Sequence, residues 1–289
     1  MTAPAIPVGR ELAAPVPERR RPIGRRAAAL LLPGYTALAV AYLFLPIVVM
    51  IAFSFNDPGG RQNITWQGFT LENYVDVWRR PDITGPMLNS VVVALVSTLL
   101  ATALGTLIAM ALVRYEFRAR GTLNLLIFLP MATPEIILGA SLLSMWVSLG
   151  VQRDITTIAI AHVMFNISYV VVTVRARLSG FDRRLEEAAM DLGASEWVTF
   201  RKVTLPLIFP GILAAALLAF ALSIDDYVIT SFVAGRTVTF PLWVFGVSRI
   251  GVPPEVNVLG TLIFLLAFVF IAVQIWIGRR ELRARPADA

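Results

Sequence analysis

Long apolar runs alternate with polar connections along this chain. Most of the runs reach the roughly 20 residues that an α-helix needs to cross a ~30 Å hydrocarbon layer. The pattern predicts an all-α polytopic membrane protein with a membrane domain at residues 30–277. Six transmembrane helices are expected, at about residues 30–54, 89–113, 122–149, 155–174, 207–224 and 255–277.

Composition supports a membrane protein and excludes several kinds of functional site. Of the 289 residues, 57% are apolar and 15% charged, against the ~25% charged share of ordinary soluble domains. Cys is absent, which excludes disulfides and thiolate chemistry. The single histidine, His162, is expected to be packed and hydrogen-bonded, since a zinc site needs further ligands.

Lys202 is the only lysine, so no P-loop sequence exists in this chain. We therefore expect no catalytic residue, bound cofactor or metal site here, and any ATP to be bound by a partner subunit.

The basic residues are distributed unevenly between the two sides of the predicted membrane domain. With the N-terminus placed in the cytoplasm, nineteen of the 25 Arg and Lys residues lie on that side. This asymmetry predicts that both termini are cytoplasmic. It also indicates that the net charge of +6 meets lipid head groups rather than nucleic acid.

Both ends of the chain are expected to be tails. Residues 1–29 are rich in Pro, Ala and Arg without apolar periodicity, which is typical of disorder. The apolar run that follows is too long for a cleavable signal and should remain as the first span. Residues 278–289 form a short cytoplasmic tail.

Small residues and prolines predict local features of three spans. Small residues at every fourth position let helix backbones approach closely. Pro130 and Pro134 each remove a backbone donor, so a break or kink is expected in the third span. The small-residue series are Ser97, Ala101, Gly105 and Ala109 in one span and Gly211, Ala215 and Ala219 in another.

The polar segment at 175–206 is longer than a plain connection between two spans requires. Asp182 can cap a helix that starts at Arg183, and Gly193 suits the left-handed residue that would close it. Ser195 can cap a second helix, which should end before Pro206. The segment is therefore predicted to be a cytoplasmic helical hairpin.

The first helix of this hairpin is amphipathic in pattern. One face of it can sit on the transporter while the other meets a partner. The apolar stripe consists of Leu185, Ala189 and Leu192, and the polar face of Arg184, Glu187 and Asp191. By pattern alone, an amphipathic loop resting on lipid head groups explains the segment equally well.

The spacing of the hairpin resembles the "EAA" loop of the membrane subunits of ABC importers. That motif reads E-A-A-x3-G-x9-I-x-L-P, and the chain departs from it only in having Val203 for Ile. The resemblance implies a coupling helix that inserts into a groove on an ATPase subunit. The matching residues are Glu187, Ala188, Ala189, Gly193, Val203, Leu205 and Pro206.

Other segments resemble the permeases of polyamine (spermidine/putrescine-type) importers, especially the second of their two permease subunits. These segments include "WQGFTLENY", "DLGASEW" and "LSIDDYVITSF". The resemblance implies the type I ABC importer permease fold in the bacterial inner membrane. It further implies a periplasmic substrate-binding protein, a second permease and two ATPase subunits as partners.

Acidic residues in or next to the spans are candidates for a substrate pathway. An ionisable group inside a span costs roughly 2.5–3.5 kcal/mol at the centre, so it usually faces a cavity or a partner. Polyamines are polycations, and the resemblance places carboxylates at Glu135, Asp225 and Asp226. Asn166 and Tyr169 are further candidates, whereas the two aspartates can alternatively cap an external helix in water.

Two other functional classes remain open from the sequence. An ion-coupled secondary transporter would use Glu135 and the aspartates as a relay, although no internal repeat is found. A non-conducting assembly subunit would need no pathway at all.

The absence of cysteine makes the predicted topology directly testable. Cysteine introduced at Arg61 or Arg236 should react with an impermeant thiol reagent added from the periplasmic side, and cysteine at Arg177 or Lys202 should not. Labelling of the Arg61 variant from the cytoplasmic side alone would overturn the arrangement.

Overall fold

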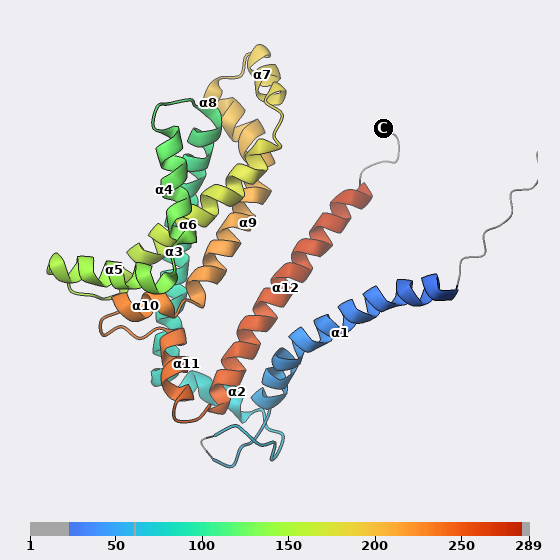
Figure 1. Ribbon diagram of the computed structural model, residues 1–289, viewed down its shortest axis with the longest axis vertical. Helices are drawn as coiled ribbons and strands as arrows, with labels where there is room; N and C mark the ends of the chain where they lie inside the picture. The colour runs from blue at the N-terminus through green and yellow to red at the C-terminus, as the bar shows by residue number, and fades with distance from the viewer. Residues whose placement is uncertain (1–22, 61, 285–289) are drawn as a thin grey trace, which may run out of the picture. The chain divides into compact units, whose positions relative to one another are not determined.

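The computed structural model describes residues 23–60 and 62–284, and these are almost entirely helical. Within these ranges the only β pairing is an isolated bridge between Asn56 and Phe69. The all-α prediction is thus confirmed. The elements are α1 Ile23–Ser54, α2 Glu72–Asp76, the 3₁₀ turn η1 Val77–Arg79, α3 Pro81–Arg114, α4 Arg120–Ala132, α5 Glu135–Ser148, α6 Ile155–Ser179, α7 Arg184–Asp191, α8 Glu196–Thr199, the π turn η2 Phe200–Thr204, α9 Leu205–Ile224, α10 Val228–Val233, α11 Phe240–Ser248 and α12 Pro254–Ala284 (Figure 1).

The chain divides into two units, Met1–Met50 and Ile51–Ala289. In the first unit, α1 exposes apolar side chains along its described length, among them Leu32, Tyr35 and Tyr42. An apolar helix surface of this kind suits lipid or a partner subunit. Most of the predicted N-terminal tail (residues 1–22 of 1–29) lies outside the described residues. Part of the predicted C-terminal tail (residues 285–289 of 278–289) lies outside them as well.

Four helices are long and apolar enough to cross a membrane, and a fifth span results if α4 and α5 count as one. The four are Leu31–Ser54, α3, α6 and the continuous helical stretch Glu196–Ile224. The sixth predicted span starts in α12, whose apolar stretch is described only as far as Val269. Six spans therefore stay a prediction.

The predicted break in the third span occurs at Pro134 rather than at both prolines. Pro130 lies inside α4, while Pro134 precedes α5. The chain bends by 106° between the two helices. Since the residue before a proline avoids the α region, Thr133 is extended and ends α4. The bend turns α5 onto α10.

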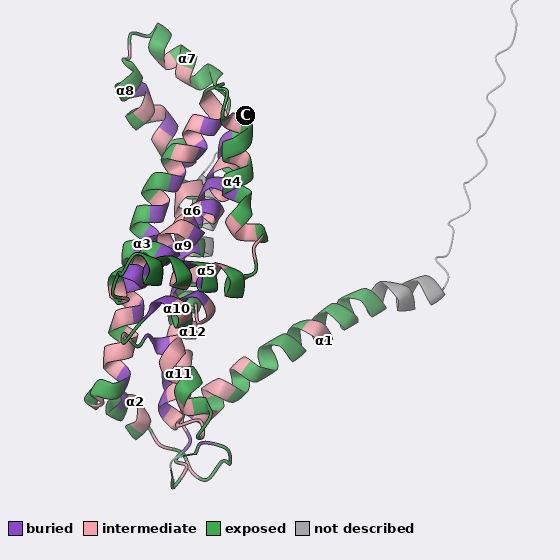
Figure 2. Cartoon of the chain, turned by 60° about the vertical axis from the view of Figure 1, so that its left-hand side comes forward, coloured by how far each residue is buried: buried purple, intermediate pink, exposed green. Residues whose placement is uncertain are grey.

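Close packing of α3 against α6 and α9 forms the centre of the second unit. The small residues Ala101, Gly105 and Ala109 are all buried, as are Ala215 and Ala219 on α9. A Cβ at Gly105 would lie 2.7 Å from Cγ1 of Val170 on α6, so no larger residue fits without movement. Figure 2 shows the buried residues gathered along these helices.

Two further clusters position the ends of the bundle. One joins α3, α5, α6 and α10 through residues such as Trp146, Phe165 and Ile229. The other joins η1, the start of α3, α11 and α12 through Ile83, Phe240 and Val258.

The hairpin forms after α6, which continues to Ser179 and so past the predicted loop start at residue 175. Its first helix starts at Arg184 instead of Arg183, with Asp182 accepting the backbone N–H of Arg184 at 3.0 Å. Gly193 has φ +89°, as predicted. Ser195 caps α8 by accepting from the N–H of Val198 at 3.4 Å.

The second hairpin helix does not end before Pro206, contrary to the prediction. A π turn carries α8 directly into α9, and the Leu205 N–H bonds to the carbonyl of Phe200. Proline is tolerated in the first turn of a helix, and the wider π turn accommodates its missing donor. Leu205 therefore stays helical, at φ −58° and ψ −45°.

The contact at Gly105 gives a stability prediction. Gly105→Ala should destabilise the folded protein by about 1–3 kcal/mol, because the new methyl group collides with Val170. Gly121→Ala is the matched control, since Gly121 lies in α4 with no atom within 4 Å of its added Cβ. Thermal unfolding in detergent should show a lower midpoint for Gly105→Ala alone, and equal midpoints would contradict the packing.

Candidate functional site

The hairpin presents an uncovered surface at one end of the bundle (Figures 1 and 2). Glu187 and Ala188 are exposed, and Ala189 is half-buried. Leu192, at 91% exposure, and Trp197, at 66%, are apolar side chains without cover. Such a patch on short helices is typical of a partner contact.

The predicted coupling residues thus fall into two groups. Glu187, Ala188, Ala189 and Gly193 lie on α7 and the turn that follows it. Val203, Leu205 and Pro206 lie where the hairpin enters α9, and none of the three is fully buried. Their role in coupling stays a prediction.

The apolar stripe is not the face on which α7 sits. Leu185 is 49% exposed and Leu192 almost fully exposed. The hairpin is instead held to the bundle by Glu186, whose carboxylate accepts hydrogen bonds from Arg114 of α3 and from Thr204 of η2. Sequence reasoning did not single out Arg114 or Glu186, because they are 72 positions apart and no local pattern relates them.

A second polar cluster lies where α9 ends and α10 begins. Asp226 accepts from the backbone N–H groups of Ile229 at 3.3 Å and Thr230 at 2.8 Å, and so caps α10. The Thr230 hydroxyl donates to the same carboxylate at 2.6 Å. His162 Nε2 stands 3.2 Å from it. Asp226 is therefore a structural residue tied to α6 and α10.

The cluster continues from His162 toward α3. The Nδ1 atom of His162 lies 2.6 Å from the Ser223 hydroxyl, which lies 2.8 Å from the Ser97 hydroxyl. His162, Ser223 and Ser97 are all buried. The lone histidine is thus packed and hydrogen-bonded, as predicted.

Asp225 differs from its neighbour because its side chain leaves the helix end toward a groove. It is exposed, and the described residues provide it with no ion pair and no side-chain hydrogen bond. The groove is apolar and aromatic, has a volume of about 390 Å³, and includes Tyr227 and Phe245. Their ring centroids are 4.4 Å apart. A carboxylate beside aromatic faces suits a cation.

The remaining pathway candidates do not meet in one cluster. Glu135 is exposed at the start of α5 and has no side-chain partner in the described part of the chain. Asn166 is completely buried on α6, and both polar atoms of its amide lack a hydrogen-bond partner among the described residues. Tyr169 packs beside Phe165, with ring centroids 4.9 Å apart. Their contact with substrate stays a prediction.

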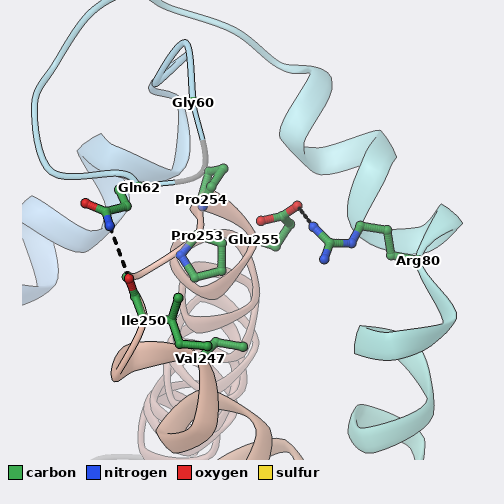
Figure 3. A pocket seen from close by; sticks show the side chains of 9 residues that line it. Gly60, Gln62, Arg80, Val247, Ile250, Pro253, Pro254 and Glu255 are labelled. Atoms are coloured by element: carbon green, nitrogen blue, oxygen red, sulfur yellow. Dashed lines mark hydrogen bonds and ion pairs between the residues drawn. The ribbon is translucent and has the colours of Figure 1, made fainter.

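The end of the bundle opposite the hairpin carries a pocket of about 650 Å³ (Figure 3). Arg80 pairs there with Glu255, whose other carboxylate oxygen is buried and without a partner in the described residues. Arg80 also donates to Asp82 at 2.8 Å, and this bond raises the pKa of the guanidinium. On the other side of the pocket, Gln62 Nε2 donates to the carbonyl of Ile250 at 3.1 Å.

Comparison with known proteins places these features in a family context. Residues 101–282 match the family described as binding-protein-dependent transport system inner membrane component. The chain is 38% identical over 260 residues to the spermidine/putrescine transport system permease protein PotC of Escherichia coli (strain K12), covering 90% of this chain and 98% of that protein. It is 38% identical over 234 residues to the putrescine transport system permease protein PotI of the same strain, covering 78% and 83%.

The fold also resembles that of a solved transporter. A chain from the crystal structure of a bacterial ABC transporter involved in the import of the acidic polysaccharide alginate superposes with a TM-score of 0.66. The identity is 14%, and the match covers 89% of this chain and 96% of that one. The predicted ABC importer permease fold is confirmed by this likeness.

The different surroundings of the two aspartates predict different effects on stability. Asp226→Ala should lower the free energy of unfolding by about 1–3 kcal/mol, because the α10 cap and the His162 partner are lost together. Asp225→Ala should change it by less than about 0.5 kcal/mol. Thermal unfolding of the purified variants checks this, and equal losses would contradict the assignment.

Proposed function

We propose a specific function for this chain from the premise that it belongs to the family of binding-protein-dependent transport system inner membrane components. It is a permease subunit of an ABC importer and a multi-pass protein of the bacterial inner membrane. An ion-coupled secondary transporter and a non-conducting assembly subunit are not favoured, since both lie outside this family. In the proposed role the chain catalyses no reaction of its own.

The proposed substrate class is polyamines such as spermidine and putrescine. Two relatives whose names specify these solutes are each 38% identical to this chain over most of its length. A polyamine has ammonium groups joined by methylene chains, so it needs carboxylates set among apolar or aromatic surfaces. Asp225 in its groove with Tyr227 and Phe245 offers that combination. Glu135 adds a second carboxylate, without a side-chain partner in the described ranges, on α5, which packs against α10.

The proposed coupling partner is an ABC ATPase subunit. The observation that carries this proposal is the exposed hairpin. It has the E-A-A-x3-G spacing, a Gly193 in the left-handed conformation and an uncovered apolar patch. Glu187 would offer a charge to a groove on the ATPase, while Ala188 and Ala189 permit close approach. ATP would be bound by that subunit, because this chain has no P-loop.

Two further partners complete the proposed importer. A periplasmic substrate-binding protein delivers the polyamine to the end of the bundle opposite the hairpin. A second permease subunit covers apolar helix surfaces that this chain leaves exposed, such as Leu99 and Leu107 on α3. Lipid covers the rest.

Reconstitution tests the proposed function. We expect a complex of this chain with its second permease and ATPase, in proteoliposomes, to hydrolyse ATP faster when spermidine-loaded binding protein is added, and to accumulate labelled spermidine. Transport without ATP or without the binding protein would overturn the proposal.

Gly193→Val tests the coupling role of the hairpin in the same assay. A β-branched residue at φ +89° costs on the order of 1–3 kcal/mol of strain, so α7 and α8 should lose their fixed angle. We expect weaker co-purification of the ATPase or loss of stimulated hydrolysis, with uptake lost in either case.

Gly150→Val is the matched control for that variant. Gly150 also has positive φ, +66°, and open space around it, but it precedes α6 whereas the hairpin follows that helix. The control should keep stimulated hydrolysis. Normal stimulation and uptake in Gly193→Val would show that the hairpin is a plain connector.

A further inference from the structure

The polar contact that holds the hairpin to the bundle has a part in coupling that differs from that of the exposed hairpin surface. Glu186 points inward and its side chain is 14% exposed, whereas the neighbouring Glu187 is exposed. Its Oε1 atom accepts from both Arg114 Nη2 and the Thr204 hydroxyl. Arg114 also reaches the Thr204 hydroxyl at 3.4 Å. One carboxylate therefore closes a triangle between α3, α7 and η2.

Electrostatics and geometry both favour this one arrangement of the three groups. Hydrogen bonds between charged partners are stronger than neutral ones, and partial burial reduces their screening by water. Thr204 is completely buried, so its hydroxyl cannot follow a displaced α7 into solvent. Any rotation of α7 must either move the end of α3 with it or break the contact.

A neighbouring hydrogen bond ties the same two segments together. Arg183, next to the start of α7, donates from Nη2 to the carbonyl of Val113 at 2.9 Å. The last carbonyls of a helix lack partners within it, and a cation there also meets the negative end of the helix dipole. The hairpin is thus attached to the terminus of α3 at two points.

The helices that receive these contacts meet again at the middle of α3 and near the C-terminal end of α9. Ser97 of α3 and Ser223 of α9 hydrogen-bond at 2.8 Å, and the chain of contacts passes through His162 to Asp226. Between the two polar contacts, α3 and α9 pack through buried small residues such as Ala101 and Ala219. The helix pair therefore connects the hairpin to the region of the two aspartates.

We propose that Arg114 and Glu186 are positioning residues, which form a clamp that transmits displacement of the hairpin into α3 and α9. The clamp does not contact the ATPase, and this inference rests on the proposed coupling of the hairpin to that subunit. Breaking the clamp leaves the ATPase bound, but the loaded binding protein no longer stimulates ATP hydrolysis through the hairpin.

Charge reversal in the reconstituted complex tests the clamp. The variants are Glu186→Arg, Arg114→Glu and the double reversal, with spermidine-loaded binding protein as the stimulus. We expect each single variant to keep the ATPase subunit and basal hydrolysis while stimulation and uptake fall at least roughly 5-fold, the low end of usual coupling energies. The double reversal should recover most of the stimulation, because the pair re-forms with opposite polarity.

Two further variants control this experiment. Glu116→Arg reverses a charge in an exposed pair, 3.9 Å from Arg120, that lies just beyond the end of α3, and it should leave stimulation unchanged. If Glu186→Arg does not fold or does not pair with the second permease, Glu186→Gln takes its place, since the amide oxygen still accepts from Thr204 while the charge is lost. It should reduce stimulation less than full reversal does.

Several results would overturn the clamp. Loss of the ATPase subunit from Glu186→Arg would make Glu186 a direct contact, and unchanged stimulation in the single variants would make the pair a passive link. If the double reversal failed to recover stimulation, the two residues would not act as a pair. A failure of the proposed function is distinct from these, because the unmodified complex would then show no stimulation and Gly193→Val would change nothing.

Discussion

The close approach of α3 to α6 and α9 is the constraint on which the rest of the described structure depends. Lipid tails are as apolar as these side chains, so no hydrophobic force drives the helices together within a membrane, and their association relies on close contact and on shared hydrogen bonds. At Gly105 the two backbones approach so closely that a single methyl group would collide with Val170. Polar side chains on these helices are consequently held within reach of one another.

That packing explains why adjacent aspartates take different roles. Where α9 ends, the chain turns into α10, and Asp226 faces back toward the helix it caps and toward His162. Asp225 faces the apolar groove with Tyr227 and Phe245. A buried carboxylate surrounded by donors contributes to the fold, whereas an exposed one next to aromatic rings is free to meet a cationic solute. Because the two residues are of the same type, the sequence of the pair alone does not distinguish these roles.

The hairpin shows a similar separation between attachment and recognition. Its outward surface combines exposed apolar and small side chains with the charged Glu187, and its attachment is a partly buried ion pair with a threonine hydroxyl. An ion pair costs free energy to desolvate, so it adds less to stability than its charge suggests. Its geometry, however, specifies one orientation of α7 relative to α3. Coupling through a hairpin requires that specificity more than it requires stability.

Much of this protein was predictable from local sequence patterns. Apolar runs predicted the long helices, small residues at every fourth position predicted the packed faces of α3 and α9, and Gly193 and Ser195 predicted the turn and the second cap of the hairpin. The E-A-A-x3-G spacing and the acidic pair pointed to the family that the comparisons then established. Each of these signals lies within one helix or one turn, where backbone geometry relates spacing to structure directly.

Tertiary structure alone decided which polar residues meet. Arg114 and Glu186 are 72 positions apart, and Ser97 and Ser223 are 126 apart. No periodicity within one segment specifies such pairs, because they depend on how whole helices cross. The same reason accounts for the uncovered stripe of α7, which depends on neighbours that are remote in sequence. The tertiary structure also decided which aspartate caps a helix and which faces a groove.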